Sequence, residues 1–541
     1  MGTNEPIDRV RALLAERGVH ARKLRRVLTL LGRDWHTLAE LVRLPAVPRR
    51  SVQELLAAAE EDLETQGERY RIAPYRTAAY TEAFGSDEGI VDPVNALISR
   101  HTDQLRSILA DIANVPAPLT ALDHVQATAD TALKRALWLD SNYDLSGRKL
   151  LCLGDHDLTS LAVCAVNPDV EVTVVDVDDR LLEFIDTLAT ERGWKIRCLH
   201  ADFRFGLPPS VLESADLVFS DPPYTAEGMG LFAGRAIDCL ADPSRGRVLL
   251  AYGFSDRTPA LGLKVQQELQ RLGLVFEAIL PAFHRFDGAQ AIGSAADLYV
   301  CRPTSRKSAQ TRSTTSSRLS APPTGIYTHG PQSVEAGGPG SGALEVLSDL
   351  APRPESSPPP KPRKPGWAEP IGKGAASLAV DLTGDPGPWL LRTLLASVPA
   401  RLAALVPNNH PNVSSEAGQH ELTSLVDSRF RLRFLRGTPD NKHTVVVAEQ
   451  VLAGELDAGG LAVREVLLRA HGKLGNVWRE ALITVSRGAL TKREARERID
   501  HAVGDHPDLD VRLIDLPRHR IAALLPLISA SAVAPVTAER T

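Results

Sequence analysis

From Lys149 onward the chain alternates short apolar runs with amphipathic helical segments, and this alternation limits the fold more than any other feature of the sequence. Strands that alternate with helices predict a largely parallel sheet with helices on both faces. The apolar runs are, in order, KLLCL, VEVTVV, KIRCL, DLVFS, RVLLAY, LVFEAIL and DLYVC. We therefore predict a doubly wound α/β domain over residues 146–303.

The rest of the chain divides around this domain. At roughly 150 residues per domain, 541 residues predict about three or four structural units. Residues 304–366 are rich in Ser, Thr, Pro, Gly and Arg and carry few large apolar side chains, so we predict a disordered linker there. Beyond it, residues 367–541 are expected to form a separate α/β module of unknown function.

The amino-terminal region alternates short amphipathic helices with tight breaks. Residues 1–75 show the outline of a winged-helix domain, and residues 76–145 are predicted to be a helical connector. The second helix of the outline, near Arg49 and Arg50, would contact DNA in one interpretation. In the other it is a helical cap on an enzyme, because a run of acidic residues follows at once. We do not expect nucleic acid as a partner.

Composition excludes several classes. With 43% hydrophobic and 24% charged residues the chain is typical of a globular protein, and a net charge of -5 gives no general attraction to nucleic acid. No stretch approaches about 18 apolar residues, so no membrane segment is predicted. The five cysteines form no C-x-x-C pair, which predicts neither a structural zinc nor disulfides. A cytoplasmic location fits best; a homodimer is left open.

Four loops are expected to meet at the carboxyl ends of the first strands, where the order of a doubly wound sheet reverses and ligands bind. They read Gly154-Asp155-His156-Asp157, Asp176-Val177-Asp178-Asp179, Ala201-Asp202-Phe203 and Asp221-Pro222-Pro223-Tyr224. Because the last two strands follow a final helix closely, the seven strands match the class I methyltransferase variant of the Rossmann fold better than the dinucleotide-binding form.

Each loop has a role in binding a nucleoside sulfonium. Asp176 stands 22 positions after Gly154 (176 - 154 = 22) and is placed to accept both ribose hydroxyls. Asp202 is a candidate acceptor for the adenine amine, and Phe203 a candidate cover for the ring. Gly154 and Pro222 complete the predicted donor-binding residues. Taken singly, each acid is more often a helix cap.

The first loop lacks the glycine-rich turn that normally receives the methionine carboxylate of S-adenosylmethionine. Asp155 and Asp157 would repel that carboxylate, whereas decarboxylated S-adenosylmethionine carries none. Together with Asp178, Asp179 and Asp221 they form an acidic cluster that needs cationic compensation, which a polyamine supplies. Magnesium is the other candidate cation, but displacement at a sulfonium gains nothing from a Lewis acid, and we predict no metal and no tightly bound cofactor.

The segments Leu153-Gly154-Asp155-His156-Asp157-Leu158-Thr159-Ser160 and Asp221-Pro222-Pro223-Tyr224-Thr225 resemble the branched-chain polyamine synthases, the N(4)-bis(aminopropyl)spermidine synthase family, over roughly residues 6–303. His156 stands where the family has its middle acid. The resemblance implies an aminopropyltransferase that moves aminopropyl groups from decarboxylated S-adenosylmethionine to a spermidine-type amine and releases methylthioadenosine.

The same resemblance implies roles for individual residues. It assigns Asp155 and Asp157 to binding and deprotonating the acceptor amine, and it places Asp221 and Tyr224 beside the reacting nitrogen. With the acidic-loop argument, our predicted catalytic residues are Asp155, Asp157 and Asp221, and our predicted polyamine-binding residues are His156, Asp178 and Tyr224. Two other functions stay open. Asp-Pro-Pro-Tyr is also the signature of nucleic-acid amino-methyltransferases, which hold an exocyclic base amine. A regulator that only senses a nucleoside or polyamine is the third interpretation.

Overall fold

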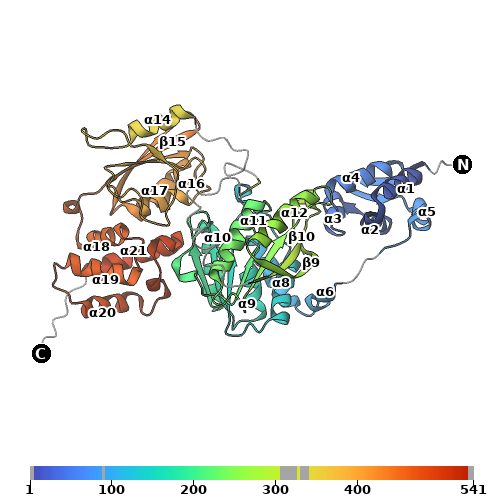
Figure 1. The fold of residues 1–541 in the computed structure, drawn as a ribbon, viewed down its shortest axis with the longest axis horizontal. Helices are drawn as coiled ribbons and strands as arrows, with labels where there is room; N and C mark the ends of the chain where they lie inside the picture. Colours follow the sequence, from blue (N-terminus) through green and yellow to red (C-terminus); the bar gives the residue numbers. More distant parts are fainter. Residues whose placement is uncertain (1–4, 88–91, 305–325, 329–339, 534–541) are drawn as a thin grey trace. The chain divides into compact units, whose positions relative to one another are not determined.

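The computed structural model describes residues 5–87, 92–304, 326–328 and 340–533 (Figure 1). Its contacts define two compact units. Unit 1 comprises Met1–Val172, Asp216–Ile237 and Asp242–Arg306, and unit 2 comprises Thr173–Ala215, Asp238–Ala241 and Lys307–Thr541. The sequence predicted residues 146–303 as one domain separate from 367–541, and this division differs from the observed one. Part of the predicted catalytic domain belongs with the carboxyl-terminal residues.

The predicted doubly wound sheet is present. It has seven strands in the order β6-β5-β4-β7-β8-β10-β9. The β4, β7 and β8 strands pair in parallel, and β10 pairs antiparallel with both β8 and β9. The mixed α/β class is therefore confirmed. Strands such as β7 are buried along their whole length, as expected for strands covered on both faces.

Unit 1 contains an amino-terminal helical part, three connecting helices and the larger share of the sheet. Its helices are α1 (Glu5–Arg17), α2 (Ala21–Arg33), α3 (Leu38–Arg43), α4 (Arg49–Ala58), α5 (Pro74–Phe84), α6 (Pro93–Ile98), α7 (Thr102–Asn114), α8 (Ala129–Asn142), α9 (Thr159–Val166), α11 (Ala226–Cys239) and α12 (Pro259–Arg271). Its strands are β1 (His36–Thr37), β2 (Leu63–Gln66), β3 (Arg69–Ile72), β4 (Lys149–Leu153), β7 (Leu217–Ser220), β8 (Arg247–Tyr252), β9 (Leu274–Arg285) and β10 (Ala295–Pro303).

The amino-terminal part has the helix, turn, helix and hairpin that suggested a winged helix. Thr37 caps α3 through a reciprocal capping box with Glu40, and the antiparallel hairpin of β2 and β3 follows α4. Apolar residues at helical spacing along α2, such as Leu24, Val27 and Leu31, form the core of this part. The elements agree with the prediction, while a winged-helix function stays a prediction.

Within unit 1, the turn after α3 and the start of α4 pack against the loop between β9 and β10. Arg43 pairs with Asp287, and Arg49 Nη1 donates to Gln290 Oε1 at 2.6 Å. Gly293 has φ +84°, and a Cβ there would lie 2.9 Å from the backbone of Ala46, so only glycine permits this approach. Arg49, which would contact DNA, instead makes an internal contact. This favours the helical-cap interpretation.

Unit 2 combines two strands of the seven-stranded sheet with a second sheet and a helical end. Its elements are β5 (Glu171–Asp176), α10 (Asp179–Arg192), β6 (Ile196–His200), α14 (Ser341–Leu350), β11 (Pro362–Arg363), β12 (Leu378–Asp381), α15 (Trp389–Ala396), β13 (Arg401–Pro407), α16 (Pro411–Ser414), α17 (Glu416–Val426), β14 (Phe430–Arg436), β15 (His443–Gln450), α18 (Ala458–Leu468), α19 (Leu474–Val485), α20 (Lys492–Val503) and α21 (Arg518–Val533). The second sheet has the order β11-β12-β13-β15-β14.

The prediction of a disordered linker over 304–366 is wrong for part of its second half. Helix α14 lies inside this range, and Leu347 on it is fully buried against residues of the second sheet, including Leu405 and Val447. Burial of an apolar helix face offsets the entropy of ordering the segment. Residues 305–325 and 329–339, also in the predicted linker, lie outside the described residues. In the described ranges, no helix is long and apolar enough to cross a bilayer.

Candidate functional site

The loop after β4 turns sharply into α9. Gly154 has φ +72°, a conformation that favours glycine, and Leu158 adopts the left-handed region just before the helix starts. Both carboxylate oxygens of Asp155 accept from the amide of Ser160, at 3.1 and 3.3 Å. Asp155 is therefore directed at the start of α9. The sequence predicted it as a catalytic acid, and the structure gives its carboxylate this helix-capping contact instead.

The other acid of the same loop lies in a different environment. Asp157 Oδ1 accepts from the amide of Ala127 at 2.7 Å, and its Oδ2 accepts from Arg135 Nη1 at 2.8 Å. The second terminal nitrogen of Arg135 donates to Asp221 Oδ2, also at 2.8 Å. The loops after β4 and β7 are thus joined by one guanidinium. Two of the predicted catalytic acids, Asp157 and Asp221, are brought together by a residue that the sequence analysis did not single out.

The side chain of Arg135 is fixed by hydrogen bonds and by a contact with an aromatic ring. It is 1% exposed on α8, its Nε donates to His284 Nδ1 at 3.1 Å, and its Nη1 also donates to Thr159 Oγ1 at 3.1 Å. Its guanidinium carbon lies 4.9 Å from the centre of the Phe219 ring. Burial and the adjacent Arg135 charge keep the pKa of His284 well below its ordinary value, so this imidazole is neutral. The planar guanidinium is fixed as a bridge between two carboxyl groups.

The two bridged acids differ in acidity. Burial, reinforced by the nearby charge of Asp157 and opposed by Arg135, raises the pKa of Asp221 to about 7. Burial also opposes ionisation of Asp157, but Arg135 and the Ala127 amide hold its pKa below the ordinary value. One arginine cannot neutralise two carboxylates, so Asp157 keeps the negative charge and Asp221 titrates near neutrality. A carboxyl group of this kind can accept a proton at physiological pH.

Tyr224 lies beside Asp221, and Tyr252 packs against Tyr224. Tyr224 donates its hydroxyl to Asp221 Oδ1 at 3.1 Å, and burial together with the adjacent acid raises its pKa well above the ordinary value, so it stays a neutral donor. The ring of Tyr224 meets the ring of Tyr252 edge to face at 5.4 Å. Pro222, between Asp221 and Tyr224, is buried. The side chain of Asp221 remains 19% exposed, which leaves it accessible to a small ligand.

His156 occupies the middle of the acidic motif. It is 8% exposed, and its ring stacks on that of His124 with centres 4.5 Å apart and planes 20° apart. The side chain that replaces the family's middle acid is therefore packed against another imidazole. A contact between His156 and a polyamine stays a prediction.

Unit 2 holds the remaining predicted residues. Asp176, 3% exposed at the end of β5, accepts from the amide of Asp178 at 2.8 Å. Asp178 caps α10 by accepting from the amide of Arg180 at 3.0 Å and also pairs with the Arg180 side chain. The sequence predicted Asp178 at the polyamine. Pairing within its own turn does not favour that contact, which stays a prediction.

Asp202 also has a role that the sequence did not predict. Its Oδ1 accepts from the amide and the Nε of Arg204 at 3.1 and 2.8 Å, and its Oδ2 accepts from Arg204 Nη2 and from Trp389 Nε1, the latter at 3.0 Å. A carboxylate offers about four acceptor positions, and these donors fill them. The contacts to Arg204 and Trp389 do not favour the adenine contact predicted for Asp202, which stays a prediction. Phe203 is buried, and its stacking on adenine stays a prediction.

The acids that the sequence predicted as one cluster thus fall into two groups, and arginines of this chain compensate most of their charge. Asp157 and Asp221 share Arg135 in unit 1, while Asp178 pairs with Arg180 and Asp179 with Arg392 in unit 2. The sequence argument required an external cation for these charges. The arginines supply most of the compensation, because a buried carboxylate without a partner is strongly destabilising.

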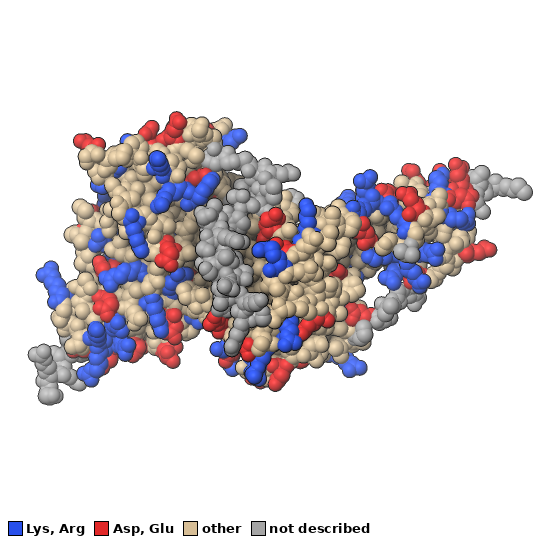
Figure 2. Space-filling view, viewed as in Figure 1, with Lys and Arg blue, Asp and Glu red and all other residues tan. Residues whose placement is uncertain are grey.

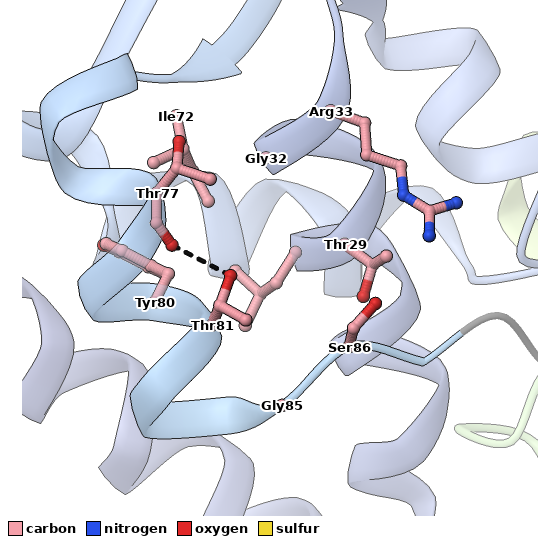
Figure 3. Close-up of a pocket in the computed structure, with 10 residues that line it drawn as sticks. Thr29, Gly32, Arg33, Ile72, Thr77, Tyr80, Thr81, Gly85 and Ser86 are labelled. Carbon is pink, nitrogen blue, oxygen red and sulfur yellow. Dashed lines mark hydrogen bonds between the residues drawn. The ribbon is translucent and has the colours of Figure 1, made fainter.

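The amino-terminal helices offer two other candidate regions, a pocket and a charged surface. A pocket among the amino-terminal helices is lined by threonines, and Thr81 Oγ1 donates there to the Thr77 carbonyl at 3.0 Å (Figure 3). Its threonine hydroxyls donate to backbone carbonyls, the Tyr80 hydroxyl donates to Asp62 Oδ2 at 3.1 Å, and the pocket contains none of the predicted site residues. On the face shown in Figure 2, basic and acidic side chains are intermixed over the amino-terminal helices. That pattern does not favour a phosphate backbone as ligand.

Comparisons with known proteins agree with the resemblance. Residues 103–315 match the family model of the branched-chain polyamine synthase A C-terminal domain. The chain is 30% identical over 226 residues to N(4)-bis(aminopropyl)spermidine synthase of Thermococcus kodakarensis, covering 40% of this chain and 60% of the relative. It is 32% identical over 149 residues to the protein of the same name from Methanocaldococcus jannaschii, covering 27% and 43%.

Among solved structures, the branched-chain polyamine synthase of Thermus thermophilus in complex with N4-aminopropylspermidine and 5'-methylthioadenosine aligns at 19% identity and a TM-score of 0.40. That alignment covers 56% of this chain and 93% of the other. The chain spans about half the length of the curated relatives it matches. The family resemblance stated from the two motifs is confirmed.

Proposed function

We propose, from the premise that residues 103–315 form a domain of the branched-chain polyamine synthase family, that this chain is an aminopropyltransferase. It moves aminopropyl groups from decarboxylated S-adenosylmethionine to an amine of a spermidine-type polyamine and releases methylthioadenosine. The relatives named N(4)-bis(aminopropyl)spermidine synthase support this substrate class. The observation that carries the proposal is the Arg135 bridge, which leaves Asp221 with a pKa of about 7.

The reaction needs a base for the acceptor. An alkyl amine is protonated in water near neutral pH, and only its neutral form has a lone pair for attack. The ionised form of Asp221 accepts the proton, and the amine nitrogen then attacks the carbon next to sulfur. The new nitrogen–carbon bond forms as the carbon–sulfur bond breaks, and methylthioadenosine leaves with the electron pair. A base whose pKa lies near the working pH is the most efficient for this transfer.

The neighbouring residues serve the same step. Asp157 carries a lasting negative charge and attracts the polyamine cation, while Arg135 prevents the two acids from repelling each other. Tyr224 orients Asp221 through its hydroxyl and offers an aromatic face to a cationic chain. Gly154, Pro222, Asp176 and Phe203 remain our proposed donor-binding residues, with Asp176 at the ribose. A cytoplasmic location and a homodimer stay predictions.

The test is product analysis with the full chain. Incubation with decarboxylated S-adenosylmethionine and a panel of polyamines should give methylthioadenosine and polyamines heavier by one or more aminopropyl groups, measured by mass spectrometry. Intact S-adenosylmethionine with the same acceptors, and with single-stranded nucleic acid, is the matched comparison. Methyl transfer in that arm, with no aminopropyl transfer in the first, would establish the methyltransferase interpretation instead. Binding of the donor with no product in either arm would favour the sensor.

A further inference from the structure

The carboxyl-terminal residues of unit 2 contact three acids that follow β5 and β6 in the chain, namely Asp179 and Asp186 on α10 and Asp202 in the loop after β6. Arg392, 0% exposed on α15, donates from Nη2 to Asp179 Oδ1 at 3.0 Å, and the amide of Arg518 donates to the same oxygen at 2.9 Å. Asp179 is the first residue of α10, directly after the predicted donor-binding loop. Burial opposes ionisation of Asp179, yet Arg392 and the Arg518 amide hold its pKa below the ordinary value.

The second contact is further along α10. His519 Nε2 lies 2.7 Å from Asp186 Oδ2, and Arg520 Nη2 donates to Asp186 Oδ1 at 2.8 Å. Both residues belong to α21, near the end of the chain. The side chain of Asp186 is 10% exposed, so this is a shielded ion pair rather than a surface one.

The third contact is at the loop after β6. Trp389 Nε1 donates to Asp202 Oδ2 at 3.0 Å, and the guanidinium of Arg204 lies 4.7 Å from the centre of the Trp389 ring. Phe205 meets the rings of Trp367 and Trp389 at 4.4 and 5.4 Å. In addition, Arg392 Nε donates to His200 Nδ1 at 3.0 Å, at the last residue of β6. The carboxyl-terminal part thus contacts both loops at the points where their strands end.

Trp389 and Arg392 make directed polar contacts, and both are buried. Trp389 and Arg392 are 3% and 0% exposed, whereas a charge that serves only solubility would be exposed. Each lies in the apolar run Trp389–Ala396, where a lone arginine is tolerated only because it is paired. These polar contacts are numerous and buried, so breaking them in each turnover would be costly. They indicate a permanent association rather than a lid that opens and closes.

We propose that Trp389 and Arg392 are positioning residues, and that the carboxyl-terminal module holds the β5 and β6 loops in the conformation that binds the nucleoside of the donor. The module then has a function: it completes the donor half of the reaction without touching the reacting atoms. This inference rests on the proposed function for the identity of the donor. It assigns a role to residues 367–541, which lie outside the family match.

The experiment uses full-length variants and methylthioadenosine as the probe. Trp389→Phe removes only the indole N–H on Asp202 and keeps an aromatic ring on Arg204. Trp367→Phe is the matched control, because it changes the same aromatic cluster and keeps every donor to Asp202. Calorimetry should show about tenfold weaker binding in Trp389→Phe, the scale of one lost hydrogen bond to a charged group, with the control unchanged. The Michaelis constant of the polyamine should not change in either variant.

A second variant tests the proposal at another residue, so that the test does not depend on the folding of Trp389→Phe alone. Arg392→Lys keeps a charge but cannot reach His200, Asp179 and the Leu516 carbonyl together, so it should also weaken methylthioadenosine binding. Arg431→Gln, at an exposed arginine of β14, is its control. Unchanged binding in both Trp389→Phe and Arg392→Lys, with thermal unfolding as in the wild type, would overturn the proposal.

Hydrogen exchange separates this inference from the proposed function. The amide of Arg204 donates to Asp202 Oδ1 and should exchange faster in Trp389→Phe, while the amide of Leu250 in β8 should not change. If the wild type neither binds methylthioadenosine nor forms product, the proposed function fails. The exchange result then still decides whether the module fixes this loop, since equal exchange at Arg204 would contradict the inference by itself.

Discussion

The acids of the two units are neutralised in different ways, and the difference indicates which of them can do chemistry. In unit 1, burial raises the pKa of Asp221 to about 7, because its one cation, Arg135, is shared with Asp157 and does not offset the cost of burial. In unit 2, Asp179 pairs with Arg392 and Asp186 with Arg520, so each has its own arginine, and their pKa values are lowered. An acid at a strand end is reactive where compensation is incomplete and structural where it is complete.

The largest expected effect comes from removing the incompletely compensated acid. Asp221→Asn should lower turnover by at least about a hundredfold, because a general base contributes 10²–10⁴-fold. The fold should remain, since the amide oxygen can still accept from Arg135 while its NH2 group donates to the Tyr224 hydroxyl oxygen. Steady-state kinetics with decarboxylated S-adenosylmethionine would measure the loss. Asp178→Asn, at an acid paired within its own turn, is the control and should retain most of the activity.

The bridge itself is the next target. Arg135→Met should cost about 3–5 kcal/mol of folding free energy, because it leaves two buried carboxyl groups without their cation. Chemical denaturation would give this value. Arg135→Lys should restore part of the stability but little activity, since one ammonium cannot span two carboxylates as the guanidinium does. A stable and fully active Arg135→Lys enzyme would show that the bridge has no part in catalysis.

The smallest expected effect is at the acid that caps α9. Asp155→Asn should change stability by no more than about 0.5 kcal/mol, because Asn accepts from a helix amide about as well as Asp. Turnover should fall far less than in Asp221→Asn. The family motif includes this acid, so a loss of activity equal to that of Asp221→Asn would contradict our assignment and return Asp155 to the catalytic residues.

The sequence predicted the sheet and its four loops because strand runs and loop acids are local signals. It missed Arg135 and Arg392, although both have a similar local signature: a basic residue among apolar residues of a buried helix, next to Lys134 in ALKRALWL and alone in WLLRTLLA. Such a charge must be paired, but the sequence does not say with which partner. Arg135 meets Asp221 86 residues away, and Arg392 meets Asp179 213 residues away.

The same limit explains the errors at the domain boundaries. The linker prediction relied on polar composition and ignored the apolar spacing Leu344, Leu347 and Leu350 within it. The carboxyl-terminal residues seemed separable because the ion pairs that join α21 to α10 connect residues more than 300 positions apart. Packing of this kind is decided by surfaces that exist only after both parts have folded.

The raised pKa of Asp221 also makes the free energy of unfolding depend on pH. Its pKa in the folded state lies above the ordinary value of 3.8, so its contribution to folding is fully present below that value and is lost as pH rises to about 7. Asp157 has the opposite sign, because its pKa is lowered. Asp221→Asn should therefore flatten the fall in unfolding free energy between about pH 4 and 7, measured by denaturation at several pH values.

The single-turnover rate of aminopropyl transfer as a function of pH tests the central claim most directly. Asp221 must be ionised to accept the proton, so the rate of the wild type should rise with a midpoint near 7, followed by a further rise as the amine titrates at about pH 8–10. In Asp221→Asn the midpoint near 7 should disappear and the second rise should remain. A wild-type rate without a midpoint near 7, or one that persists in Asp221→Asn, would contradict the assignment of Asp221 as the base.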